Sequence, residues 1–304
     1  MTAYKVEYRI NNGSWVNITV DGVNGDAGTS ACSGTCIQWT WTPVLTTITP
    51  STDIDFQISD WGNPTKVNNT NSQTPGQEYK VIGKLTVNAP NTAIKYFIGN
   101  TIPISWNKTG SIGTLTIEYS PKGDFSDTVS IATLQPSGAV DGINTYSSNW
   151  FAPNTANKVS ENYKVKIRTD ALAAGLALED VSDVAFQVRP TIDAIASPLS
   201  NGSSVWLVGE TTRTINWTAT STTKTNGTNP KVSIEYKTST GSWTLLHNPG
   251  STNLDSVNGS SNSYTWPSIP IENNEGVQIR ISYDEYPDDV KLISPQTFAI
   301  RPKI

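Results

Sequence analysis

The chain has very few of the side chains on which most catalytic and metal sites depend. Its 304 residues include one histidine, His247, and two cysteines, Cys32 and Cys36. Activation of a serine or cysteine nucleophile usually requires a neighbouring histidine, and zinc sites use histidine and cysteine ligands. A single histidine in a Leu-Leu-His-Asn-Pro-Gly segment offers little for such chemistry. We therefore expect no enzyme, no catalytic residue and no bound cofactor.

Charged residues are also scarce, at 15% of the chain against roughly 25% in an average soluble domain. The net charge is −5, without a basic stripe, and nucleic acid binding relies on clustered Lys and Arg. This balance argues against a nucleic acid partner. No apolar run approaches the roughly 20 residues of a membrane-spanning helix, so we expect no direct membrane insertion in this segment. Ser, Thr, Asn and Gly fill most polar positions, which is common in extracellular β-proteins and favours an extracellular or cell-surface location.

The two cysteines lie close together in the segment Ala-Cys-Ser-Gly-Thr-Cys-Ile. A metal site would need further ligands nearby, and His247 is far away in the sequence. Small disulfides persist in exported proteins, where the environment is oxidising. The favoured interpretation is therefore a loop-closing disulfide between Cys32 and Cys36.

The most informative feature that the chain does contain is an internal repeat. The dipeptide Glu-Tyr closes a short apolar strand pattern three times, at intervals of roughly 110 to 120 residues. It occurs at Glu7-Tyr8, Glu118-Tyr119 and Glu235-Tyr236. Five tryptophans recur in the same register: Trp106 matches Trp217, and Trp41, Trp150 and Trp266 match one another. Because the same position is tryptophan in successive copies, we predict that these five residues are structural core.

Each complete repeat contains about seven short strand patterns with alternating apolar residues, separated by turn signals, and almost no helical pattern. We therefore predict an all-β chain of three tandem antiparallel β-sandwich domains of the Ig-like kind. The expected domains are residues 1–88, 89–192 and 193–304. The first copy has no Ile-x-Trp strand and no opening strand, so we expect an incomplete sandwich that lacks its N-terminal strands, in a segment cut from a longer array.

Linkers between the repeats are nearly absent. Phe186-Gln-Val-Arg-Pro190 runs from the last strand of the second copy into the third copy within a few residues. Proline fixes φ and removes a donor, so this junction should be stiff and extended. Phe298-Ala-Ile-Arg-Pro302 matches the same junction, at a place where another domain could begin.

Two alternative kinds of site compete with a purely structural interpretation. Four acidic residues in one loop, Asp284, Glu285, Asp288 and Asp289, are weak candidates for calcium, which takes 6 to 8 oxygen ligands. Trp61 and Trp206 have no counterpart in the other copies and are candidates for exposure, as a sugar-binding surface would require. A third aromatic set, Trp15, Phe125 and Trp243, follows a glycine turn in each copy and is expected to pack on that turn.

The combined pattern resembles the Ig-like or fibronectin-III-like repeats of microbial cell-surface proteins, and most closely the Ser/Thr-rich cell-wall (KNH-like) domain. The motifs that carry it are Gly99 with Ile104-Ser105-Trp106, Ile117-Glu118-Tyr119 and Val165-Lys166-Ile167-Arg168, and Gly209 with Ile215-Asn216-Trp217, Ile234-Glu235-Tyr236 and Val277-Gln278-Ile279-Arg280. The resemblance implies a non-enzymatic structural protein: a surface stalk, an adhesin, or a filament or surface-layer building block. Its partners would be neighbouring domains or chains of the same array. The alternative is a carbohydrate-binding surface module with a glycan or other cell-surface ligand.

The cysteine pair generates the first testable prediction. We expect the intact protein to keep its mass on thiol alkylation without reductant, and to gain two alkyl groups after reduction, because a disulfide leaves no free thiol. Two alkylated thiols without reductant would contradict the disulfide and point to a reducing compartment.

Overall fold

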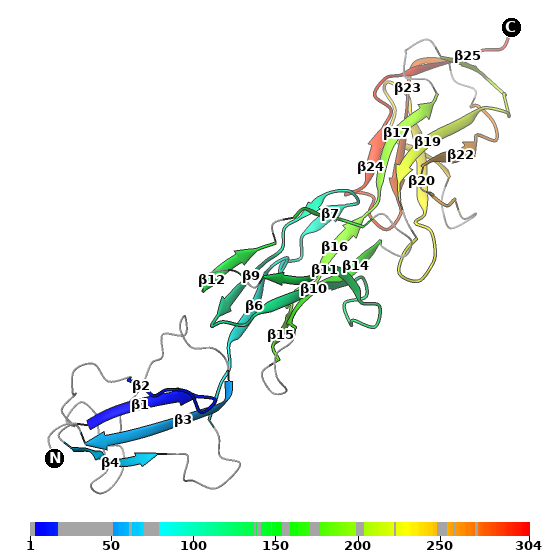
Figure 1. Ribbon diagram of the computed structural model, residues 1–304. Helices are drawn as coiled ribbons and strands as arrows, with labels where there is room; N and C mark the ends of the chain where they lie inside the picture. The colour runs from blue at the N-terminus through cyan, green and yellow to red at the C-terminus, as the bar shows by residue number, and fades with distance from the viewer. Residues whose placement is uncertain are drawn as a thin grey trace, which may run out of the picture.

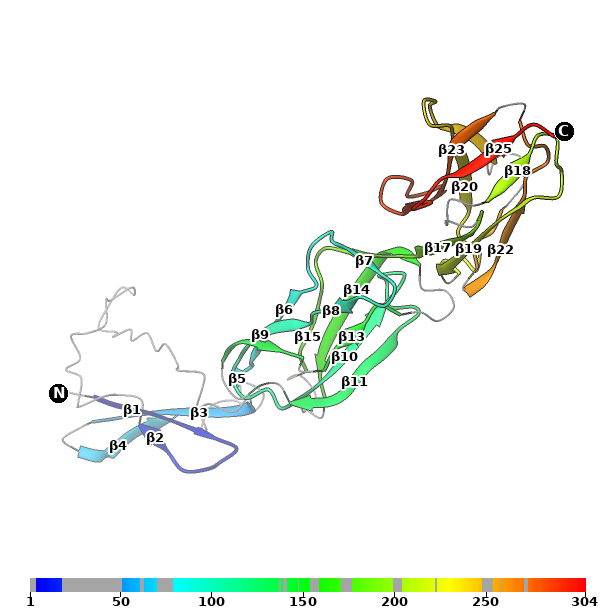
Figure 2. The ribbon, with the colours of Figure 1, turned by 90° about the horizontal axis from the view of Figure 1, so that it is seen from above.

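The computed structural model has three all-β parts in a row, with the two termini at opposite ends of an elongated molecule (Figures 1 and 2). It describes residues 4–17, 51–60, 63–69, 79–136, 138, 141–146, 148–153, 159–170, 177–198, 204–221, 223–247, 254–257, 259–270 and 273–304. Cys32, Cys36, Trp41 and Trp61 lie outside these ranges, so the predictions made for them stay predictions.

The described strands of the first part form one sheet. They are β1 (Tyr4–Ile10), β2 (Val16–Asn17), β3 (Ser51–Asp60), β4 (Asn63–Asn69) and β5 (Tyr79–Val81). The order is β2-β1-β3-β4, with β5 also beside β3. Alternate residues of β1 and β3 put their apolar side chains on one face, where Tyr8 pairs with Phe56 and Ile10 with Ile54.

The second part packs strands into separate sheets of a sandwich. Its strands are β6 (Lys84–Ala89), β7 (Lys95–Phe97), β8 (Thr101–Ile102), β9 (Ser105–Thr109), β10 (Thr114–Ser120), β11 (Val129–Pro136), β12 (Gly142–Thr145), β13 (Trp150–Phe151), β14 (Ser160–Thr169), β15 (Glu179–Val181) and β16 (Phe186–Arg189). The larger sheet runs β11-β10-β14-β16-β7 with β15 beside β14; the opposing strands run β12-β9-β6, and β13 pairs with β8.

The third part repeats this arrangement. Its strands are β17 (Thr191–Ser197), β18 (Val205–Leu207), β19 (Thr214–Thr220), β20 (Val232–Lys237), β21 (Thr244–His247), β22 (Gly259–Thr265), β23 (Asn274–Tyr283), β24 (Lys291–Ile293) and β25 (Phe298–Arg301). The larger sheet runs β18-β25-β23-β20-β21 with β24 beside β23, opposite β17-β19-β22. The chain is thus a tandem array of antiparallel β-sandwich domains.

Strand pairing assigns the strand at each domain boundary to the domain that follows it. β6 pairs with β9, so the strand that straddles residue 88 belongs wholly to the second domain. β17 pairs with β19 in the same way and belongs wholly to the third domain. The opening strand of each of these domains starts almost directly after the closing strand of the domain before it.

The repeated tryptophans lie in the cores. Trp106 and Trp217 are 2% and 0% exposed, and Trp150 and Trp266 are also buried. The tyrosine of each Glu-Tyr pair packs against one of them: the ring centroids of Tyr119 and Trp150 are 5.1 Å apart, and those of Tyr236 and Trp266 are 5.0 Å apart. Aromatic pairs at this separation contribute favourably beyond their buried area.

The expectation that Trp206 is exposed is wrong. Its side chain is 4% exposed, and its ring centroid lies 4.9 Å from that of Phe298. The cause is the parallel pairing of β18 with β25, which puts Trp206 opposite Ile300. In the second domain Tyr96 occupies the same position on β7, opposite Val188. The counterpart of Trp206 is therefore a tyrosine, which a search for matching tryptophans misses.

The aromatic residue after the glycine turn lies on the domain surface under a cation. The Lys166 ammonium is 4.6 Å from the Phe125 ring centroid, and the Arg280 guanidinium is 4.4 Å from that of Trp243. In the first domain the guanidinium of Arg9 lies over the Trp15 ring. These are partly exposed cation–π contacts, each worth about 0.5–1 kcal/mol.

Two tryptophans of the third domain test this division between core and surface. Trp217→Ala should lower the free energy of unfolding by about 3–5 kcal/mol, because it opens a cavity in a fully buried site. Trp243→Ala should lower it by only about 1 kcal/mol. Urea unfolding followed by circular dichroism measures both, and equal losses would contradict the assignment.

Candidate functional site at the junction of the second and third domains

The junction between the second and third domains has almost no linker. Pro190 alone separates β16 from β17, and both Arg189 and Pro190 are buried. A second backbone contact lies beside it, where the amide of Val159 donates a hydrogen bond of 3.3 Å to the carbonyl oxygen of Thr223. The two domains are therefore connected twice: by the chain itself at Pro190, and by the backbone hydrogen bond between Val159 and Thr223.

Arg189 is the central side chain of this junction. Its guanidinium carbon lies 3.4 Å from the ring centroid of Tyr286, which comes from the β23–β24 loop of the third domain. Arg189 Nη1 donates to Glu161 at 2.9 Å and Nη2 donates to Gln187 at 2.6 Å, both within the second domain. The side chain is only 4% exposed. A planar guanidinium held flat by two acceptors presents its face to an aromatic ring, and desolvation strengthens that contact.

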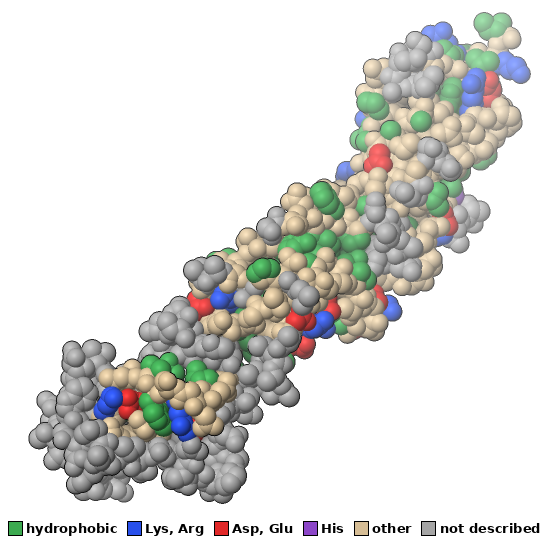
Figure 3. Space-filling model, viewed as in Figure 1, with side chains coloured by type: hydrophobic (Ala, Val, Ile, Leu, Met, Phe, Trp, Pro, Cys, Tyr) green, Lys and Arg blue, Asp and Glu red, His purple; other side chains and the backbone are tan. Residues whose placement is uncertain are grey.

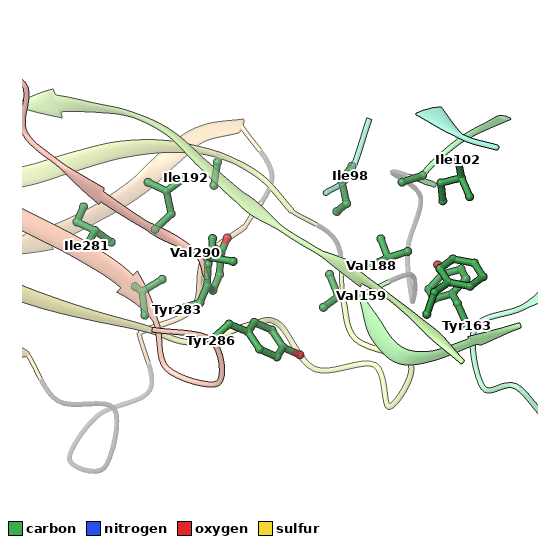
Figure 4. Close-up of a cluster of buried hydrophobic side chains, with 14 of the residues drawn as sticks. Ile98, Ile102, Val159, Tyr163, Val188, Ile192, Ile281, Tyr283, Tyr286 and Val290 are labelled. Atoms are coloured by element: carbon green, nitrogen blue, oxygen red, sulfur yellow. The ribbon is translucent and has the colours of Figure 1, made fainter. Parts of the chain in front are cut away.

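Apolar contacts surround the stacked pair. Tyr286, Val290 and Val159 are 7%, 4% and 1% exposed, and they belong to one buried cluster that runs through both domains. Figure 4 shows Tyr286 directed from the third domain toward the second, below Val159. Burial of this apolar surface favours one docked arrangement over a freely turning joint.

The acidic residues of the β23–β24 loop, considered above as calcium ligands, have four separate partners. Asp284 accepts a hydrogen bond from Ser233, Glu285 from Lys224 and Asp289 from Lys95, while Asp288 lies 3.5 Å from Lys291. The pair between Lys95 and Asp289, at 2.6 Å, crosses the junction. Within the described ranges, no group of three or more His, Cys, Asp or Glu side chains is placed to hold a metal ion.

The protonation of the loop residues reflects these contacts. Burial raises the pKa of Tyr286 to about 12, an effect that the positive charge of Arg189 partly opposes. The hydrogen bond from Lys95 lowers the pKa of Asp289. At neutral pH the junction thus pairs a neutral phenol with a guanidinium and a carboxylate with an ammonium.

A pocket of about 350 Å³ lies beside the docked loop. Its walls are residues 159–162 of the second domain and 224–226, Glu285 and Tyr286 of the third. The carboxylates and the lysine in these walls already pair with one another or with Arg189. The pocket is a gap between two docked domains, and its charged groups already form ion pairs at the junction.

The first junction is built differently. Ile82 and Gly83 are the two residues before the opening strand β6, as Arg189 and Pro190 are the two residues before β17. A Cβ on Gly83 would lie 2.2 Å from Cγ2 of Ile112 in the second domain. Close approach of backbone and side chain, rather than a buried charge, therefore defines this contact.

His247 is a buried residue of the third domain. It ends β21, is 7% exposed, and its ring centroid is 5.2 Å from that of Tyr264. The part of the chain that the structure describes has no helix that could span a membrane.

Comparisons with protein-family models and with curated proteins found no match. Among solved structures, the chain is similar to the fibronectin(III)-like modules of Clostridium thermocellum CbhA, at 17% identity over 72% of this chain and 94% of that one, with a TM-score of 0.23. It is also similar to titin A168169, at 9% identity over 73% and 96%, with a TM-score of 0.35. The three N-terminal domains of the bacteriophage RB49 Hoc capsid protein match at 11% identity over 100% and 89%, with a TM-score of 0.27. No functional argument rests on these likenesses, and the narrower resemblance to the KNH-like domain stays a prediction.

The stacked tyrosine generates a pH prediction. Because the folded pKa of Tyr286 is raised, its contribution to stability is complete below its ordinary pKa of about 10 and is lost as the pH rises toward about 12. Ultraviolet absorbance measures the ionisation of tyrosine phenols as the pH rises. The wild-type curve minus the Tyr286→Phe curve should show the ionisation of one phenol with a midpoint near pH 12. A difference curve centred near 10 would show that Tyr286 is solvated and not stacked.

Proposed function

We propose that this chain is a non-enzymatic extracellular structural protein, a segment of a tandem β-sandwich array that acts as a surface stalk, adhesin, or filament or surface-layer building block. Its task is mechanical: to hold its ends apart and resist bending. The array of antiparallel sandwiches supplies the rod, and the docked junction supplies the stiffness.

The observation that carries the proposal is the burial of Arg189 beneath Tyr286. A freely jointed pair of domains would leave this guanidinium in water. Here it is desolvated between Glu161, Gln187 and the ring of the next domain. Bending the joint would separate the charge from its aromatic partner, and so each bend has a free-energy cost.

The surface supports the same proposal. On the face shown in Figure 3, charged side chains of the described residues are few and scattered, and hydrophobic side chains gather over the second domain. Large single-sign patches, which attract charged partners at long range, do not appear on this face. Such a charge distribution suits an extracellular spacer that does not attract charged partners at long range.

The carbohydrate-binding alternative finds no support among the described tryptophans. Trp106, Trp150, Trp206, Trp217 and Trp266 are buried, and Trp15 and Trp243 are partly buried under cations. Stacking on a sugar needs an exposed ring face.

Small-angle X-ray scattering of the full chain tests the proposal. Arg189→Ala should broaden the distribution of interdomain angles, because removing a desolvated stack of about 1–2 kcal/mol raises the population of open joints about tenfold. Arg189→Lys should have a similar effect, since an ammonium lacks the planar face.

Arg168→Ala is the matched control, since Arg168 pairs with Glu118 and Asp170 on the outer face of the second domain. Its scattering should match that of the wild-type protein. A wild-type chain that already scatters as freely jointed beads, or an Arg189→Ala variant as stiff as the control, would overturn the proposed function.

A further inference from the structure

The end of the third domain has the same backbone hydrogen bonds as the end of the second. In the second domain the amide of Ile98 donates to the carbonyl of Arg189 at 2.9 Å; in the third, Val208 donates to Arg301 at 3.0 Å. The next glycines, Gly99 and Gly209, both have positive φ. Each donates a hydrogen bond of 3.1 Å to the opposing strand or loop, at Ala152 and Ile269.

The side chains that receive the next domain are also repeated. Strand pairing makes Arg301 the counterpart of Arg189 and Glu275 the counterpart of Glu161. Arg301 donates to Glu275 through Nε at 2.9 Å and through Nη2 at 3.1 Å. A proline follows each arginine, at 190 and 302.

The two arginines differ in what covers them. The Arg189 side chain is 4% exposed beneath Tyr286, whereas that of Arg301 is 53% exposed. Glu275 holds the guanidinium of Arg301 by two hydrogen bonds, which restrict the rotation of the guanidinium plane. The third domain therefore has an exposed, hydrogen-bonded guanidinium at its end, and no aromatic ring among the described residues stacks on it.

We infer that this end of the third domain, formed by Arg301, Glu275 and the turn at residues 208–210, is an acceptor surface for another β-sandwich whose β23–β24-type loop presents a tyrosine. The inference rests on the proposed function and extends it to the partner. The partner is a domain of this same repeat type, because among the described residues the ring that covers such an arginine is Tyr286.

Two parts of the docked junction are not repeated. Gln187, which accepts a hydrogen bond from Arg189, has Ala299 as its counterpart on β25. Lys95, which pairs with Asp289, has Val205 as its counterpart on β18. The acceptor surface thus has the arginine for a stack but lacks the lysine for an ion pair across the junction. Binding should therefore depend on Arg301 and on the tyrosine, and only weakly on the acidic residues or on salt.

The test extends the full chain by one domain. Residues 191–304 are joined directly after Pro302, so that Arg301-Pro302 precedes the added domain as Arg189-Pro190 precedes the original. Ile293→Val in the added copy gives its loop peptide a distinct mass in hydrogen–deuterium exchange. We expect the added loop at 284–290 to exchange within about twofold of the original loop.

Arg301→Ala at the new junction should then speed exchange of the added loop about tenfold and leave the original loop unchanged, as loss of one desolvated stack requires. Arg301→Lys should act in the same direction, and Arg168→Ala should change neither loop. An added loop that exchanges equally fast with and without Arg301, or an added domain that fails to fold there, would overturn the inference. Failure of the proposed function would look different, because the original loop would then be unprotected as well.

Discussion

A buried arginine needs partners for its charge, and this requirement holds the second and third domains in one arrangement. Arg189 lies where the second domain ends, one residue before the third begins. The second domain supplies the acceptors Glu161 and Gln187, and the third supplies the ring of Tyr286. Neither domain alone covers the guanidinium. The orientation of the two sandwiches follows from this shared burial. The same burial holds the acidic β23–β24 loop against the second domain.

The acidic loop shows how a local sequence pattern acquires its role from its surroundings. Four carboxylates within six residues suggest a cation site when they are read along the chain. In the folded array they diverge, and Asp289 reaches across the junction to Lys95. Tyr286, in the middle of the same loop, stacks on Arg189 of the preceding domain. In this loop Asp289 forms an ion pair with the preceding domain, and the ring of Tyr286 provides the specific contact.

Much of the fold can be predicted because its signals are local and repeated. Trp217 lies in β19 and Trp266 directly follows β22, and each has a counterpart one repeat away. Trp206 shows the limit of that reasoning, since its counterpart Tyr96 is a different aromatic. Its burial depends on parallel pairing of β18 with β25, two strands far apart in the sequence. The strands at the domain boundaries, β6 and β17, also depend on pairing, because each pairs with a strand of the domain that follows the boundary.

The sequence by itself determined the repeat, the all-β class, the near absence of linkers and the likeness of Arg189-Pro190 to Arg301-Pro302. These features follow from periodicity and residue type, which short-range physical chemistry controls. Only the tertiary structure decided that Arg189 is buried while Arg301 is exposed, and that the ring of Tyr286 covers Arg189. Stacking across a junction joins residues about a hundred positions apart, and such a contact exists only once two separately folded domains have docked.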